Sequence, residues 1–71
     1  MAISDEIRKR REAQGLSQNE LAEAAGIAQP QIAKYESGMF VPNAITAVAI
    51  AERLGTTVER LVKGENASEH S

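Results

Sequence analysis

The stretch SQNELAEAAGIAQPQIAKYESG, residues 17–38, predicts two short helices that are joined by a tight corner. Ser17 can accept a hydrogen bond from an amide in the first turn of a helix, while the Glu20 side chain accepts one from the Ser17 amide. This reciprocal arrangement, the capping box, marks where the first helix begins. Gly26 suits the left-handed conformation in which a helix ends and turns sharply. We therefore expect the first helix between Ser17 and Gly26.

A second helix is expected after the corner, beyond Ala28. Pro30 is tolerated near its start because the first amides of a helix have no acceptor within the helix. Gly38 is the residue that ends it. Ala22 is small at the point where the two crossing helices must approach closely. The apolar residues that can point into a shared core are Leu21, Ala25, Ile27, Ile32 and Tyr35. The segment is therefore interpreted as a helix-turn-helix unit, with the second helix as its recognition helix.

Polar side chains occupy the outward face at the start of the recognition helix, which is where such a unit meets base edges. Gln29 and Gln31 each present a donor and an acceptor together, a pattern that can match adenine in the major groove. Lys34 can donate to guanine or to a phosphate, and Pro30 offers only an apolar contact, for example with a thymine methyl. Ordinary surface polarity is the alternative, because glutamine is common on any exposed helix face. We interpret Gln29 as the main base reader, with Gln31 and Lys34 as secondary contacts.

The same residues carry a resemblance to a known family. The chain resembles the Cro/C1-type (XRE-like) helix-turn-helix transcriptional regulators of prokaryotes and phages in three motifs, RxxxGLSQxELA, GIxQxxIxxYExG and PxxxxxxxIAxxLGTTVExLVKG. The resemblance extends over residues 7–64. It implies an all-α fold, a compact five-helix lambda-repressor-like DNA-binding domain over residues 1–64. It also implies that Gln18 anchors the unit on a DNA phosphate, together with the amides at the start of its helix. Residues 65–71 have too little apolar content to order themselves, so we expect a disordered C-terminal tail.

Three further helices are expected around this unit. The first is capped by Ser4 and runs to about Gln14. Another is expected to begin at Asn43, behind a proline, and to end at Gly55. A last one is capped by one of two neighbouring threonines, and its apolar residues lie on one side. The candidate caps are Thr56 and Thr57, and the apolar side is formed by Val58, Leu61 and Val62.

Four basic residues stand in a row on the first helix, namely Arg8, Lys9, Arg10 and Arg11. Consecutive residues point in different directions on a helix, so the four cannot all serve one surface, and a solvated face is the alternative to a contact surface. Arg8 and Lys9 are our candidates for DNA-phosphate contacts, while the stem of Arg10 is expected to cover apolar surface. By the family resemblance, Arg11 forms a structural ion pair with Glu36.

Two segments depart from the family pattern. Met39, Phe40 and Val41 follow the recognition helix, in a loop where relatives commonly carry basic or polar residues. Ile45 and Ala49 lie one turn apart in the next helix, at positions that are usually polar. Extra packing within the domain is one explanation, because a helix that is apolar all round is normally buried. The other explanation is a dimer interface that contains these five residues and is built from this loop, this helix and the last helix of the domain.

Composition limits the remaining functions. The chain has 71 residues, enough for one core but not two, and a domain of this size is only marginally stable, which makes dimerisation a useful supplement. It has no cysteine, which excludes disulfides and thiolate metal sites. Without a basic and apolar leader or a long apolar run, we expect a cytoplasmic protein that does not contact a membrane. Without a nucleophile near a histidine or a glycine-rich phosphate loop, we expect no catalytic residue, no metal and no cofactor.

The formal net charge is −2, from eight Lys and Arg residues against ten Asp and Glu residues. DNA-binding proteins usually carry a basic excess, and one module neutralises few phosphates. Two linked modules would contact successive major-groove faces about 34 Å apart. The sequence thus favours a transcriptional regulator that binds double-stranded DNA as a homodimer, on a pseudo-palindromic operator. The alternative is a protein-interaction module, such as an antitoxin or a polymerase-binding regulator, that uses the patch Met39–Val41. Repression and activation both stay open.

Overall fold

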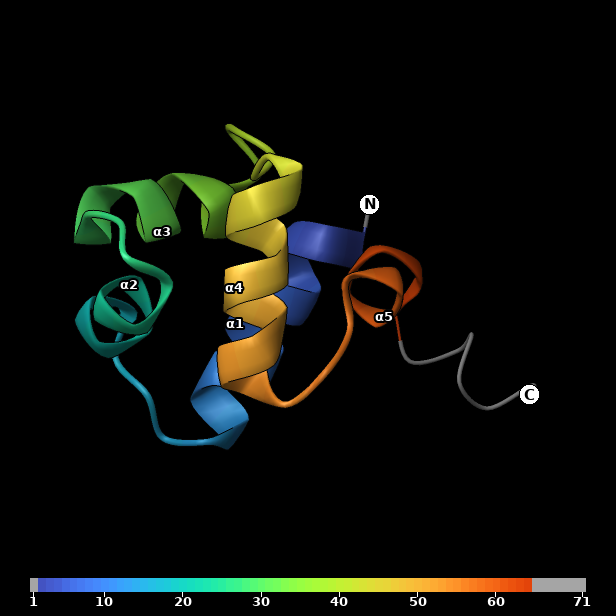
Figure 1. Cartoon of the computed structure of the whole chain (residues 1–71), viewed down its shortest axis with the longest axis horizontal. Helices are drawn as coiled ribbons and strands as arrows, with labels where there is room; N and C mark the ends of the chain where they lie inside the picture. Colours follow the sequence, from blue (N-terminus) through green and yellow to red (C-terminus); the bar gives the residue numbers. More distant parts are fainter. Residues whose placement is uncertain (1, 65–71) are drawn as a thin grey trace.

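The computed structural model describes residues 2–64, which contain five α-helices and no strand. The helices are α1 (Ala2–Ala13), α2 (Gln18–Ala25), α3 (Gln29–Ser37), α4 (Ala44–Leu54) and α5 (Val58–Lys63). In Figure 1, α1 and α4 stand in the middle of the molecule, with α2 and α3 on one side and α5 on the other. The expected all-α fold with five helices is therefore confirmed.

The helix-turn-helix unit has the boundaries that its capping residues predict. Ser17 Oγ accepts a hydrogen bond from the Glu20 amide at 3.0 Å, and Glu20 Oε1 accepts one from the Ser17 amide at 2.8 Å. Gly26 ends α2 with a φ of 75°, and Gly38 ends α3 with a φ of 84°. Both values lie in the left-handed region, where glycine avoids the steric cost that a side chain adds. The corner between the two helices therefore follows from local chemistry.

Local caps also start α4 and α5. Asn43 Oδ1 accepts a hydrogen bond from the amide three residues later at 2.9 Å, and Thr57 Oγ1 does the same at 3.2 Å. Of the two neighbouring threonines, Thr57 is thus the cap of α5. The far end of α4 is held by the residue that follows α1, because Gln14 Nε2 donates to the Leu54 carbonyl at 2.7 Å. This bond satisfies one of the carbonyls that a helix end leaves without an internal donor.

The start of α1 differs from the sequence prediction. The helix begins at Ala2, so Ser4 lies inside its first turn and does not cap it. Ile3 is partly buried against the core, one turn before the fully buried Ile7. Extending the helix through Ile3 keeps both isoleucines on one face, and burial of such a side chain, worth about 1.5–3 kcal/mol, outweighs a cap worth about 1 kcal/mol. Ser4 lies instead beside Gly38, at the end of α3.

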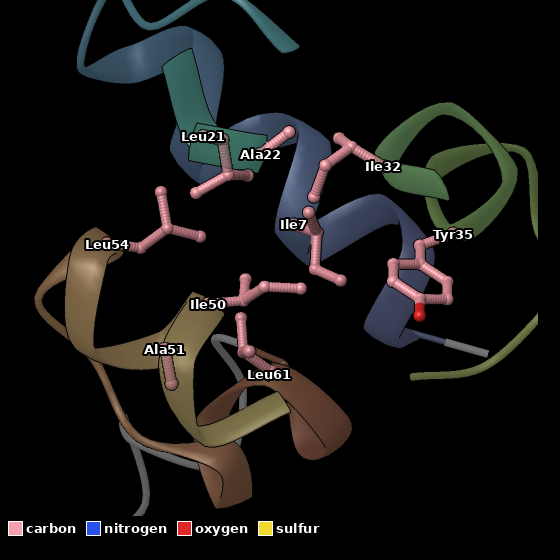
Figure 2. Packing of buried hydrophobic residues seen from close by; sticks show 9 residues of the cluster. All are labelled: Ile7, Leu21, Ala22, Ile32, Tyr35, Ile50, Ala51, Leu54 and Leu61. Carbon is pink, nitrogen blue, oxygen red and sulfur yellow. The ribbon is translucent and has the colours of Figure 1, made fainter. Parts of the chain in front are cut away.

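One apolar core lies between the five helices. The buried cluster consists of Ile7, Leu21, Ala22, Ile32, Tyr35, Ile50, Ala51, Leu54 and Leu61. Figure 2 shows these side chains converging from every helix of the described chain. Ala25 and Ile27 are partly buried and pack against the cluster, which confirms the shared core that was predicted for the helix-turn-helix unit. The core thereby holds α2 and α3 in a fixed position relative to the other helices.

The short helix α5 buries only part of its apolar side. Leu61 is fully buried and Val58 packs against the core, but Val62 is 41% exposed. Leu61 and Val62 are neighbours in the chain, and successive residues point about 100° apart on a helix. The six-residue helix rests on α1 and α4 through the side that carries Leu61, and Val62 lies at the edge of that side. Val58, Leu61 and Val62 share one side of the helix at this spacing, but that side is buried at Leu61 and exposed at Val62.

Candidate nucleic-acid interface

The face of α3 that points away from the core carries the predicted base-reading residues. Ile32 and Tyr35 hold the opposite face of the helix in the core. The residues on the outward face are Gln29, Pro30, Gln31 and Lys34, of which the two glutamines are half-buried and the other two are exposed. Gln31 Nε2 donates to the Tyr35 hydroxyl at 3.4 Å, which leaves the carbonyl oxygen of its amide for a partner outside the domain. A rigid helix thus presents polar groups outward.

Arg11 of α1 and Glu36 of α3 form the ion pair that the family resemblance implies. Arg11 Nε donates to Glu36 Oε2 at 2.6 Å, and Arg11 Nη2 donates to Glu36 Oε1 at 3.0 Å. Arg11 Nη1 also donates to the Leu16 carbonyl at 2.7 Å. The Arg11 side chain is 11% exposed and the Glu36 side chain 4%. The hydrogen bonds that Arg11 donates to Glu36 raise the pKa of Arg11 against the opposing effect of burial, so Arg11 stays charged.

Two of the predicted DNA contacts are hydrogen-bonded to each other. Gln18 and Gln29 are the first residues of α2 and α3. Gln29 Nε2 donates to Gln18 Oε1 at 2.8 Å, and Gln18 Nε2 donates to Glu36 Oε1 at 3.1 Å. The sequence alone predicts two separate contacts and does not predict this connection. We call the series Arg11, Glu36, Gln18 and Gln29 the polar chain, which runs from the interior of the domain to its outward face.

The basic run on α1 is partly neutralised by acidic residues of the same helix. Arg8 Nη2 lies 3.5 Å from Asp5 Oδ1. Lys9 Nζ and Arg10 Nε lie 3.3 Å and 2.9 Å from the carboxylate oxygens of Glu6. Arg8 and Lys9 keep about half of their side-chain surface exposed. The pair between Arg8 and Asp5 is exposed on both sides and therefore weak, whereas the Glu6 side chain that pairs with Lys9 is 6% exposed. Both side chains are therefore exposed enough to contact a phosphate.

Lys34 connects the recognition helix to the loop that follows it. Its Nζ lies 5.3 Å from the centre of the Phe40 ring, within the range of a cation–π interaction. The amides of Met39 and Phe40 donate to the Lys34 carbonyl at 3.1 Å and 3.4 Å. The loop is thus attached to the same helix that carries Gln29.

The loop after α3 exposes three large apolar side chains. Met39 is 66% exposed, Phe40 49% and Val41 71%. Between this loop and α4, Pro42 is buried, so the backbone is anchored while the preceding side chains face solvent. Extra packing within the domain is therefore the wrong explanation for these three residues.

The outer side of α4 also exposes apolar side chains. Ile45 is 83% exposed, while Ala49 is half-buried. Val48 is 47% exposed as well, although the family pattern does not single it out. It follows Ile45 by three positions, and residues at that spacing lie on the same side of a helix. We use the name apolar patch for the exposed apolar side chains of the loop and of α4 together, which are Met39, Phe40, Val41, Ile45 and Val48.

Among residues 2–64, no group of three His, Cys, Asp or Glu side chains is placed to hold a metal ion. Within the same part of the chain, the helices are too short or too polar to cross a membrane. The predicted disordered tail, residues 65–71, lies outside the described residues.

Known proteins share this sequence pattern and fold. The helix-turn-helix family profile matches residues 7–61. An uncharacterised HTH-type transcriptional regulator of Methanothermobacter thermautotrophicus is 43% identical over 49 residues, which span 69% of this chain and 71% of that protein. The P22 c2 repressor in complex with a synthetic operator is 25% identical with a TM-score of 0.87, over 92% of this chain and 98% of that one. SinR, a master regulator for biofilm formation, in complex with DNA is 28% identical with a TM-score of 0.79, over 84% and 97%.

Proposed function

The chain belongs to the Cro/C1-type (XRE-like) family of helix-turn-helix transcriptional regulators, and from this premise we propose that it binds a specific double-stranded DNA operator as a homodimer. The observation that carries the proposal is the outward face of α3, where polar side chains stand on a helix that the core holds in place. Such a helix fits the major groove, in which each base pair displays a distinct pattern of donors and acceptors. The solved relatives that are bound to DNA support this docking mode.

Gln29 is the main base reader in this proposal. Its amide offers a donor and an acceptor to adenine, and its hydrogen bond to Gln18 restricts its rotation before DNA binds. Gln31 and Lys34 make secondary contacts from the same face of α3. Pro30 offers an apolar surface that suits a thymine methyl. A good bidentate contact contributes about 1–3 kcal/mol of discrimination against a wrong base, and this is the contribution we assign to Gln29.

Phosphate contacts hold the unit in register. Gln18 begins α2, where backbone amides without an internal acceptor attract an anion. Arg8 and Lys9 add positive charge from the exposed side of α1. Contacts of this kind carry no sequence information, so they strengthen binding to operator and random DNA alike.

The apolar patch supports the homodimer. Large apolar side chains that gather on one exposed surface are typical of protein interfaces. A two-fold contact between two patches presents the same residues from both copies, and it places two recognition helices on successive major-groove faces, about 34 Å apart. A pseudo-palindromic operator matches that symmetry. The second copy also doubles the number of phosphate contacts, which matters because a single domain with a net charge of −2 neutralises few phosphates.

A heterologous protein partner is the second candidate. The exposed loop Met39–Val41 favours it, because a complementary apolar surface on another protein would cover the same side chains. In that case the helix-turn-helix serves mainly as a scaffold, and the chain acts as an antitoxin or a polymerase-binding regulator. Both candidates are binding functions that need no catalytic residue, metal or cofactor, and both operate in the cytoplasm, where the DNA lies.

Selection of duplexes from a randomised library, followed by footprinting upstream of the chain's own gene, tests the proposal. A specific regulator protects a symmetric site, and its affinity falls steeply as the salt concentration rises. Sedimentation of the protein with that duplex should show two copies per site. A chain that stays monomeric at micromolar concentration and does not change its sedimentation when DNA is added contradicts the proposal and favours the protein partner.

A further inference from the structure

We propose that Glu36 determines base specificity from inside the domain, by setting the direction in which the Gln29 amide faces the DNA. This inference rests on the proposed function, because it concerns the base contact of Gln29. Glu36 does not reach the outward face, since its side chain is 4% exposed and lies between Arg11 and Gln18. Glu36 is therefore a positioning residue that acts through Gln18.

The direction of the Gln29 amide follows from the chemistry of the Glu36 carboxylate, which can accept hydrogen bonds but cannot donate them. Gln18 must turn its Nε2 toward Glu36, and the two atoms lie 3.1 Å apart. The Oε1 atom of Gln18 is then left to face Gln29, whose Nε2 donates to it at 2.8 Å. Each amide in the polar chain thus has one allowed orientation.

Arg11 gives the polar chain a rigid origin. Its two hydrogen bonds to Glu36, at 2.6 Å and 3.0 Å, engage both carboxylate oxygens and hold the plane of the carboxylate. Both side chains are nearly buried, so water competes little for these bonds. The polar chain therefore begins at a fixed acceptor in the interior and ends at the amide that faces the DNA.

The orientation of that amide matters for the choice of base. With its Nε2 turned toward Gln18, the Gln29 amide has one N–H and its Oε1 left for the DNA. Those two groups match N7 and the amino group of adenine. If the Gln29 amide is reversed, its oxygen faces the acceptor N7 and its nitrogen faces the donor amino group of adenine, so neither group can form a hydrogen bond. The reversed nitrogen can, however, donate to O6 of guanine. The polar chain is therefore expected to favour adenine over guanine at the position that Gln29 reads.

Glu36→Gln is the direct test. An amide at position 36 has one donor and one acceptor, so Gln18 can face it either way round and Gln29 gains both orientations. A bidentate contact sets the preference for adenine over guanine at about 5-fold to about 150-fold, and we expect this preference to fall close to parity in the Glu36→Gln variant. Arg11→Lys is the matched control, because it weakens the ion pair but keeps the acceptor at position 36. It should keep the preference.

A double variant, Gln18→Glu with Glu36→Gln, provides a rescue. The carboxylate then stands one step further along the polar chain, where it still only accepts, so Gln29 must again turn its Nε2 toward position 18. The added charge near a phosphate should lower the affinity for every duplex. The preference for adenine over guanine should nevertheless return, because it is a ratio of affinities.

The variant Gln29→Ala first identifies the base pair that Gln29 reads, because discrimination at that base pair is lost. The preference for adenine over guanine is then the ratio of the Kd values for two duplexes that differ only at this base pair. Loss in Glu36→Gln, retention in Arg11→Lys and recovery in the double variant support the inference. An unchanged ratio in Glu36→Gln, an equal loss in Arg11→Lys or no recovery in the double variant overturns it. If Glu36→Gln does not fold, Gln18→Met, which cuts the polar chain but leaves the ion pair, must lose the preference in the same way.

Failure of the proposed function gives a different result. A wild-type chain that selects no DNA sequence refutes base reading but leaves the polar chain open to a test without DNA. The side-chain amide signals of Gln18 and Gln29 in NMR spectra then test whether Glu36 sets the orientation of the two amides. Both signals shift in Glu36→Gln and not in Arg11→Lys if Glu36 sets their orientation, and signals that stay unchanged in Glu36→Gln overturn the inference.

Discussion

Replacement of Arg11 by methionine should destabilise the domain severely. Methionine keeps an apolar stem but removes the charge and the two hydrogen bonds that neutralise Glu36. The Glu36 side chain is 4% exposed, so its carboxylate would remain in the interior without a countercharge. The hydrogen bond from Arg11 to the Leu16 carbonyl is lost as well. Loss of one partner of a buried ion pair typically costs about 3–5 kcal/mol of unfolding free energy.

This cost is large compared with the total stability of the domain. At about 0.05–0.15 kcal/mol per residue, a chain of 71 residues has an unfolding free energy of about 4–11 kcal/mol. Because Arg11 is 11% exposed and water reaches part of the site, we expect the lower end of the range for Arg11→Met, about 3 kcal/mol. A large share of the molecules should therefore be unfolded in concentrations of urea that leave the wild type folded.

Urea unfolding followed by far-UV circular dichroism measures this loss. The matched control is the double variant Arg11→Met with Glu36→Leu, which removes both charges. It should recover most of the lost stability, because apolar residues of similar volume often replace a buried ion pair at little cost. A loss below about 1 kcal/mol for Arg11→Met, or a double variant that is as unstable as the single one, refutes the reasoning.

The pH of this experiment has little effect on Arg11 itself. Its pKa is raised in the folded state, so its contribution to stability is fully present below the ordinary arginine pKa and is lost only as the pH rises through the folded value. Between about pH 6 and about pH 9, Arg11 therefore carries the same charge in both states. Any change of wild-type stability in that range must come from other groups.

Three further predictions concern the proposed interfaces and the capping box. Ile45→Lys should dissociate the homodimer in sedimentation experiments while changing stability by less than about 0.5 kcal/mol, because this side chain is 83% exposed; a dimer that persists excludes the apolar patch as its interface. Arg8→Ala should weaken binding to operator and random duplexes equally and lower the slope of log K against log salt by about 1, and a loss confined to the operator contradicts a phosphate contact. Ser17→Ala should lower the unfolding free energy in urea by about 1 kcal/mol, since it removes one half of the capping box; a loss within experimental error shows that the box does not stabilise α2.

The elements of this fold that could be predicted from sequence are those whose signals are local. The caps at Ser17 and Asn43 act on amides three residues away, and Gly26 ends α2 through its own backbone conformation. In each case the interacting groups stand close together in the chain, so the local sequence is enough to predict where the helix begins or ends. Ser4 has the same chemistry, but the burial of Ile3 in a core built by other helices extends α1 past it. A contact with distant residues decided that boundary.

The candidate site could be predicted as a set of residues and not as a connected structure. Gln29 and Gln18 are 11 positions apart, and Gln18 and Glu36 are 18 apart. Only the packing of α2 against α3 brings these side chains within hydrogen-bonding distance. Glu6 illustrates the same limit, because it is 5% exposed and accepts a hydrogen bond from Arg10, and its burial depends on residues packed around α1. Sequence patterns identify which groups are available, and tertiary packing determines which of them meet.

The central claim is that α3 reads DNA bases through Gln29. The most direct measurement compares the affinities of the wild type and Gln29→Ala for the selected operator, for its single base-pair variants and for a random duplex of equal length. We predict that Gln29→Ala loses about 1–3 kcal/mol of discrimination at one base pair in each half-site and keeps the wild-type affinity for random DNA. An equal loss of affinity for the operator and for random DNA would contradict the claim.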